Sequence, residues 1–133
     1  MSHFTNVQTR IRDLTCLTAA LKDLGYEFTE AKAGQKVVVR GYQKDTVEAD
    51  ISIKASKKFD IGVVVTDSGV EFVADWWGVE TGRGVTQDEF VQLVTQRYAY
   101  HKVKKEAVKR GYRLDMEEVK EDQTISIKVS KWG

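Results

Sequence analysis

The sequence predicts an α+β fold, in which a mainly antiparallel sheet and two helices form a two-layer sandwich. Apolar and polar residues alternate in successive short stretches between residues 36 and 77, as in half-buried antiparallel strands. Two other stretches, residues 13–24 and 86–110, repeat apolar residues at steps of three and four, as helices do. The nearest named arrangement is a ferredoxin-like core with extra strands.

A strand over residues 4–11 is expected to lead into the first helix. Asp13 has the position of an N-cap, and Gly25 follows as a left-handed C′ residue. Cys16 lies among the apolar residues of this helix, which indicates a buried and unreactive thiol. The apolar face comprises Leu14, Leu17, Leu21 and Leu24.

The central strands are predicted over four stretches with short turns, the last of them ending in adjacent tryptophans. Because neighbouring strand residues point to opposite faces, Trp76 is expected in the core and Trp77 on the reverse face. Residues 78–84, rich in glycine, are expected to form a flexible loop in which Arg83 could meet a carboxylate or phosphate. The four strands are residues 36–42, 47–55, 61–65 and 70–77.

The second helix carries complete start signals. Thr86 and Glu89 form a capping box, and Gly111 is placed to end the helix near residue 110. Two strands, residues 112–119 and 124–132, close the chain. The segment Ile51-Ser52-Ile53-Lys54-Ala55-Ser56-Lys57 is echoed by Ile125-Ser126-Ile127-Lys128-Val129-Ser130-Lys131. One domain over residues 1–133 is expected. Two explanations of the echo stay open: an imperfect duplication that gives two halves on one sheet, or two strands that each need an apolar inner face and a polar outer face.

Composition and charge argue against several classes of function. The 133 residues hold 21 Lys and Arg against 20 Asp and Glu, so bulk nucleic-acid binding has no electrostatic support. His3 and His101 have no Cys or His at ligand spacing, and no cofactor or catalytic motif is present, so we expect no metal and no cofactor. The absence of a leader, of a long apolar run and of a second cysteine indicates cytosol or organelle stroma.

The leading hypothesis is a non-enzymatic module that binds a protein partner, for example as an assembly factor. Exposed tryptophan is typical of binding surfaces, and the reverse strand face would expose Trp77 together with Trp132. The turn around Tyr98–His101 adds tyrosine, arginine and histidine to the candidates. The candidate partner-binding residues are Trp77, Arg83, Arg97, Tyr100, His101 and Trp132.

Two alternatives remain open. One is a nucleic-acid-binding module on the basic second half of the long helix, although acidic residues interrupt and follow it. The other is an enzyme with Tyr100, His101 and Asp75 in one site, which requires these groups to converge. The candidate nucleic-acid contacts are Lys102, Lys104, Lys105, Lys109, Arg110 and Arg113.

Four segments resemble a family named hypothetical chloroplast reading frame thirty-five, from cyanobacteria and algal plastids. They are Met1-Ser2-His3-Phe4, Leu24-Gly25-Tyr26, Ala74-Asp75-Trp76-Trp77-Gly78 and Gln96-Arg97-Tyr98-Ala99-Tyr100-His101-Lys102-Val103. The resemblance covers essentially the whole chain. It implies a soluble protein of a photosynthetic cell or plastid stroma, and it supplies no catalytic residues to carry over.

Overall fold

The computed structural model describes residues 3–119 and 125–131, with side chains up to Tyr112. It confirms the predicted class, α+β with mainly antiparallel sheets. The chain divides into two compact units. The first unit is Met1–Arg12 with Gly25–Phe90, and the second is Asp13–Leu24 with Val91–Gly133.

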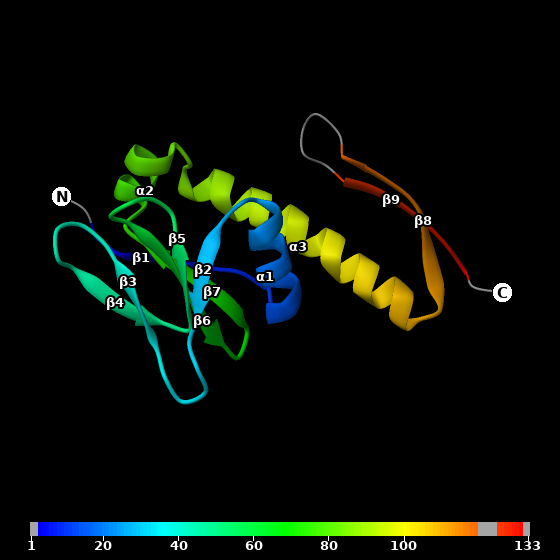
Figure 1. The fold of residues 1–133 in the computed structure, drawn as a ribbon, viewed down its shortest axis with the longest axis horizontal. Helices are drawn as coiled ribbons and strands as arrows, with labels where there is room; N and C mark the ends of the chain where they lie inside the picture. Colours follow the sequence, from blue (N-terminus) through cyan, green and yellow to red (C-terminus); the bar gives the residue numbers. More distant parts are fainter. Residues whose placement is uncertain (1–2, 120–124, 132–133) are drawn as a thin grey trace. The chain divides into compact units, whose positions relative to one another are not determined.

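A five-stranded antiparallel sheet forms the first unit, in the order β1-β7-β6-β5-β2 (Figure 1). Three strands therefore separate β1 from β2, whereas a ferredoxin-like core places one strand between the two that flank its first helix. The difference arises because the β5–β6–β7 meander fills the sheet between its two edges. The bounds are β1 Thr5–Gln8, β2 Glu27–Glu30, β5 Ile51–Lys54, β6 Asp60–Thr66 and β7 Gly69–Ala74.

One face of this sheet carries the core of the first unit. Phe72 of β7 and Phe90 are fully buried, with ring centroids 5.1 Å apart at 90°. Tyr26 also meets Phe90 edge to face at 5.5 Å, and Trp76 packs on the same ring at 5.8 Å. Such aromatic clusters supply much of the apolar burial of a small unit. The buried aliphatic residues on this face are Ile51, Ile53, Ile61, Val63 and Val70.

The reverse face is covered in part by a ribbon of two strands, β3 (Val37–Arg40) and β4 (Thr46–Ala49). A Cβ on Gly62 would lie 2.8 Å from Val39 and 3.1 Å from Ala49, so the ribbon packs where Gly62 leaves room. Strands β4 and β5 are separate and belong to different sheets, so the predicted continuous strand over residues 47–55 is wrong.

The chain bends at Asp50, which separates β4 from β5. The backbone N–H of Asp50 donates to the Val63 carbonyl at 2.9 Å. Its carboxylate accepts from the Val65 N–H at 2.7 Å and from Lys36 Nζ at 2.5 Å. These contacts hold the residue where the chain passes from the ribbon to the main sheet. The alternation of apolar residues continues through the bend, which is why the sequence pattern did not show it.

Residues Trp76–Arg83 form a helix, α2, where a strand end and a flexible loop were predicted. Asp75 is its N-cap and accepts from the Gly78 N–H at 3.3 Å, and Gly84 ends it with φ of 81°. Trp76 is buried and Trp77 is 61% exposed, as expected. The physical reason for this difference in exposure is not the one predicted. The two residues lie on a helix, where successive side chains point about 100° apart, and not on opposite faces of a strand.

In the second unit, α1 (Leu14–Asp23) begins as predicted. Asp13 is its N-cap and accepts from the Cys16 N–H at 3.1 Å, and Cys16 is buried, which raises the pKa of its thiol. The long helix α3 (Gln87–Lys109) starts in the first unit with the predicted capping box, Thr86 N to Glu89 Oε1 at 3.1 Å and Glu89 N to Thr86 Oγ1 at 3.2 Å.

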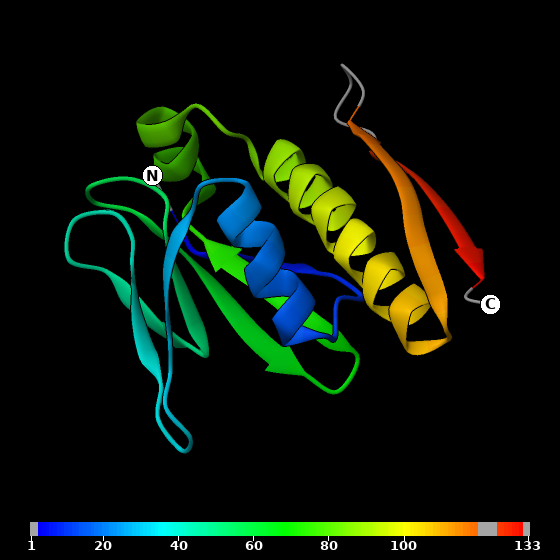
Figure 2. The same ribbon diagram turned by 45° about the vertical axis from the view of Figure 1, so that its right-hand side comes forward.

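The two closing strands, β8 (Tyr112–Val119) and β9 (Ile125–Lys131), are confirmed and pair with each other as a separate sheet. Figure 2 shows α3 running directly into this hairpin. The echoed strands β5 and β9 belong to different sheets, so the open alternative of two halves on one sheet does not describe their pairing, and a duplication of the sequence stays open. No helix in the described part of the chain has the length and apolarity needed to cross a membrane.

Candidate functional site

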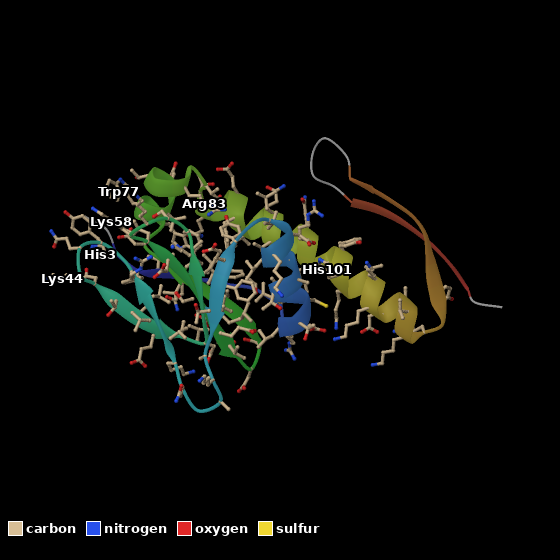
Figure 3. The ribbon with its side chains drawn as sticks, in the orientation of Figure 1. His3, Lys44, Lys58, Trp77, Arg83 and His101 are labelled. Carbon is tan, nitrogen blue, oxygen red and sulfur yellow. The ribbon has the colours of Figure 1, made fainter. Side chains whose placement is uncertain are left out.

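A groove of about 900 Å³ lies on the first unit, where three segments meet. They are the turn between β3 and β4, the turn between β5 and β6, and helix α2. Figure 3 shows Lys44, Lys58 and Trp77, one from each segment, at the same end of this unit. We call it the Trp77 groove, defined by Tyr42, Lys44, Lys57, Lys58, Phe59 and Trp77.

Two glycines place helix α2 against the groove. A Cβ on Gly78 would overlap the Phe59 ring, and one on Gly82 would lie 2.8 Å from Ser56 Oγ. The two glycines are four residues apart, so they share one helix face, and that face packs closely on the β5–β6 turn. Trp77, next to Gly78 on α2, lines the groove, and its carbonyl accepts from Thr81 Oγ1 at 2.7 Å.

The β3–β4 turn is held from both sides. The Gly41 N–H donates to the Asp45 carbonyl at 2.8 Å, and the Asp45 N–H donates to the Tyr42 carbonyl at 3.0 Å. Gln43 adopts the left-handed region with φ of 56°, which a tight turn requires. Gly41 is buried with the Phe4 ring over it, leaving no room for a side chain. Tyr42 and Lys44 are therefore presented to the groove by a defined turn.

An ion pair joins the β3–β4 ribbon to the β5–β6 turn. Arg40 Nε and Nη2 donate to the two carboxylate oxygens of buried Asp60 at 2.8 and 2.9 Å, and Nη1 donates to the Lys57 carbonyl at 2.7 Å. The hydrogen bonds that Arg40 donates to Asp60 raise the pKa of Arg40, because they stabilise the charged guanidinium. The positive charge of Arg40 is thus used within the fold, and its contact fixes the β5–β6 turn.

The remaining cations of the groove are not neutralised in this way. The side chains of Lys44, Lys57 and Lys58 form no ion pair with another residue in the described part of the chain. Asp45 is the acidic residue among those that line the groove. The first unit as a whole has ten Lys and Arg against twelve Asp and Glu, so this groove is a positive region on a unit of net negative charge.

Arg83, expected to meet an anion, has partners within the first unit. Its guanidinium carbon lies 4.0 Å from the centre of the Tyr26 ring, and Nη1 donates to the Ala55 carbonyl at 3.2 Å. Burial raises the pKa of the Tyr26 hydroxyl, and Arg83 opposes that rise. Arg83 therefore attaches the end of helix α2 to the core through a cation–π contact, and this contact is structural.

In the second unit, the basic half of α3 carries its own counter-ions. Asp13 pairs with Lys105 at 2.6 Å and with Lys102 at 3.5 Å, and Lys102 also pairs with Glu106 at 3.5 Å. The hydrogen bond from Lys105 holds the pKa of Asp13 far below its usual range, and the same bond raises the pKa of Lys105. The nucleic-acid alternative stays a prediction, with two of its lysines already paired.

The aromatic turn of α3 is also engaged within the second unit. His101 Nε2 lies 2.5 Å from the Asp23 carboxylate, and the Tyr100 and His101 rings meet at 4.8 Å. Lys104 Nζ lies over the Tyr100 ring at 5.6 Å. Tyr98 accepts the Asp13 backbone N–H at 3.2 Å.

The predicted site residues fall into separate units. Trp77 and Arg83 belong to the first, while Arg97, Tyr100 and His101 belong to the second. Neither unit holds all three groups of the enzyme hypothesis, because Asp75 is in the first. One Asp75 oxygen caps α2, and the other is buried without a hydrogen-bond partner. Trp132 lies outside the described residues, as does the side chain of Arg113.

The sequence interpretation missed five residues of the Trp77 groove. The sequence pattern places Lys57 and Lys58 in a turn between two predicted strands, and Tyr42 at the end of a predicted strand. The available signal was the stretch Lys57-Lys58-Phe59, two cations beside an aromatic ring at a hairpin turn. The described residues contain no group of three His, Cys, Asp or Glu that could hold a metal ion. The missed residues are Tyr42, Lys44, Lys57, Lys58 and Phe59.

Comparison with known proteins gives a family. Residues 20–128 match the family described as a protein of unknown function, DUF1257. The chain belongs to this family. It is 32% identical to the "Uncharacterized protein ycf35" of Guillardia theta over 99% of the chain and 98% of that protein, and 32% identical to the protein of the same name from Pyropia yezoensis over 100% and 99%.

A third relative, from Cyanophora paradoxa, is also named uncharacterized protein ycf35 and is 32% identical over 99% of the chain and 98% of its own length. The predicted resemblance to hypothetical chloroplast reading frame thirty-five is therefore confirmed, and these relatives are plastid-encoded. No solved structure matches the chain.

Proposed function

We propose that this protein is a non-enzymatic binding module that holds a protein partner at the Trp77 groove, as an assembly or scaffolding factor of a photosynthetic cell. The proposal rests on one observation, a tryptophan that is 61% exposed beside a groove of about 900 Å³. A tryptophan left in water and set in a concave surface is typical of interface anchors, because its large ring loses much water-exposed area on binding.

Two further features support a binding role. The walls around Trp77 are defined by the Arg40–Asp60 pair, by the turn at Tyr42 and by the glycine contacts of α2. A surface that is ordered before binding loses little conformational entropy when a partner docks. The tryptophan, the tyrosine and the unpaired lysines offer apolar contact and charge without a catalytic group among them. A cytosolic or stromal location is part of the proposal.

Affinity purification with a single substitution tests the proposal. The tagged full-length protein and its Trp77→Ala variant are incubated with an extract of cyanobacterial cells or plastids, and retained proteins are identified by mass spectrometry. Val38→Ala is the matched control, since Val38 is 57% exposed on the same unit and does not line the groove. We expect a partner retained by the wild type and the control and lost by Trp77→Ala.

The stability of the variants separates binding from folding. Because Trp77 is exposed, its replacement should change the free energy of unfolding by less than about 0.5 kcal/mol. Retention of the same proteins by a folded Trp77→Ala variant would overturn the proposal.

A further inference from the structure

The Trp77 groove combines aromatic rings with charges of one sign. Trp77 and Tyr42 are exposed, and Phe59 is half-buried beneath Gly78. Lys44, Lys57 and Lys58 line the groove with these rings, and their side chains form no ion pair among the described residues. Rings favour an apolar or aromatic side chain, and unpaired ammonium groups favour carboxylates.

We propose that the segment bound in the Trp77 groove is an acidic stretch of polypeptide that carries an apolar or aromatic anchor residue. This inference rests on the proposed function and adds the chemistry of the partner. The anchor side chain packs against Trp77 and Tyr42, and flanking Asp or Glu residues face the three lysines. Charge complementarity selects the segment, because the lysines have no internal counter-ions to displace.

The charge of the surroundings favours an acidic peptide over a nucleic acid. The first unit carries twelve acidic against ten basic residues, and four of its cations, Arg40, Lys44, Lys57 and Lys58, line the groove. A polynucleotide needs a continuous basic path along its phosphates, and the acidic remainder of the unit would repel it. A short acidic segment needs positive charge only where it docks.

A peptide library displayed on phage, with 12 to 16 random residues (about the length of one docking segment), provides the probe. The library is selected on the full-length wild-type protein at low salt, and enriched peptides are synthesised for affinity measurement. We expect enriched peptides to contain several Asp or Glu residues next to Leu, Phe or Trp. Their affinity should fall by about tenfold or more in Trp77→Ala, since an aromatic anchor commonly carries much of the binding energy.

Charge reversal tests the lysines. The double variant Lys44→Glu with Lys58→Glu should also weaken binding by about tenfold or more, because it turns attraction into repulsion at close range. The control is Arg10→Glu with Lys32→Glu, which makes the same change of net charge on the same unit at exposed residues outside the groove. It should leave the affinity within about twofold, because exposed charges at a distance are screened.

The outcomes distinguish this inference from the proposed function. Neutral or basic peptides that require Trp77 but not the lysines would overturn the acidic assignment and leave the proposed function standing. Selection of no peptide that requires Trp77 would overturn both. Retention of single-stranded RNA through Trp77, in place of acidic peptides, would also overturn the inference.

Discussion

Two regions of this protein have similar composition and different surroundings. The Trp77 groove and the basic half of α3 (residues 102–109) both combine lysines with nearby aromatic rings. On α3, Asp13 and Glu106 neutralise Lys102 and Lys105, and Lys104 lies over Tyr100. In the groove, the three lysines have no such partners in the described structure. Composition does not show whether a lysine is paired with a carboxylate inside the protein. That pairing distinguishes a structural cluster of lysines from a candidate binding surface.

The largest expected effect comes from removing the ion pair that supports the groove. Asp60→Ala leaves Arg40 without its carboxylate and should lower the free energy of unfolding by about 3 kcal/mol. The value is at the low end for a buried pair because the Arg40 side chain is 43% exposed and can be hydrated. Chemical denaturation measures the change. Asp60→Asn, which keeps a hydrogen-bonding group, should lose less, and equal losses would contradict the bidentate role.

A second change targets the close packing of α2. Gly78→Ala should destabilise the protein by about 2 kcal/mol, since the new methyl group must displace the Phe59 ring from the groove. Gly82→Ala is the comparison, because its Cβ meets only the small Ser56 side chain and alanine favours helix. Thermal unfolding of both variants measures the difference. A Gly78→Ala protein as stable as Gly82→Ala would contradict the contact described.

The compensated cluster should respond to pH. The folded-state pKa of Asp13 lies below its ordinary value of 3.8, so the cluster stabilises the protein above about pH 4 and loses this contribution as pH falls. Asp13→Asn keeps the N-cap and removes the charge. It should cost about 1 kcal/mol at pH 7, and less at about pH 2, where Asp13 begins to be protonated in the folded protein as well.

Denaturant titrations at both pH values measure this change. Asp67→Asn, in an exposed hairpin turn, is the control and should show no such pH dependence. An Asp13→Asn penalty that is the same at about pH 2 and pH 7 would contradict the pairing with Lys105 and Lys102.

The smallest expected effect concerns the local potential at Trp77. Relative to their quenching of free N-acetyltryptophanamide, iodide should quench the fluorescence of Trp77 more strongly than caesium by about twofold, because the unpaired lysines attract an anion and repel a cation. Subtracting the quenching of a Trp77→Phe variant isolates this residue from Trp76 and Trp132. Lys44→Glu with Lys58→Glu should remove the difference. Equal quenching by the two ions in the wild type would show that the groove is not positive.

The sequence predicted the elements that depend on local signals. Asp13, Thr86 and Glu89 cap their helices as expected, because each satisfies backbone N–H groups within its own turn. Helix α2 was missed because strand alternation continues to Trp77, and because two glycines lower its helix propensity. It forms where Asp75 caps it and its glycines pack on residues about twenty positions earlier. Such packing leaves no local pattern.

The candidate site was predictable only in part. Trp77 was found, since exposed tryptophan is informative wherever it occurs. Tyr42, Lys44 and Lys58 were not, because they come from turns that the fold brings together at α2. Arg83 was an expected binding residue, and its contacts with Tyr26 and Ala55 depend on a helix that the sequence did not reveal. Sequence patterns do not predict which residues meet when only the tertiary structure brings them together.

The most direct test of the Trp77 groove is hydroxyl-radical footprinting of the protein in complex with the partner captured from photosynthetic cells. Free and bound protein are oxidised, and modification of each residue is quantified by mass spectrometry. We predict that oxidation of Trp77 and Tyr42 falls severalfold on binding, while oxidation of Tyr100 on α3 is unchanged. Protection of Tyr100 with unchanged oxidation of Trp77 would place the partner on the other region and contradict the account.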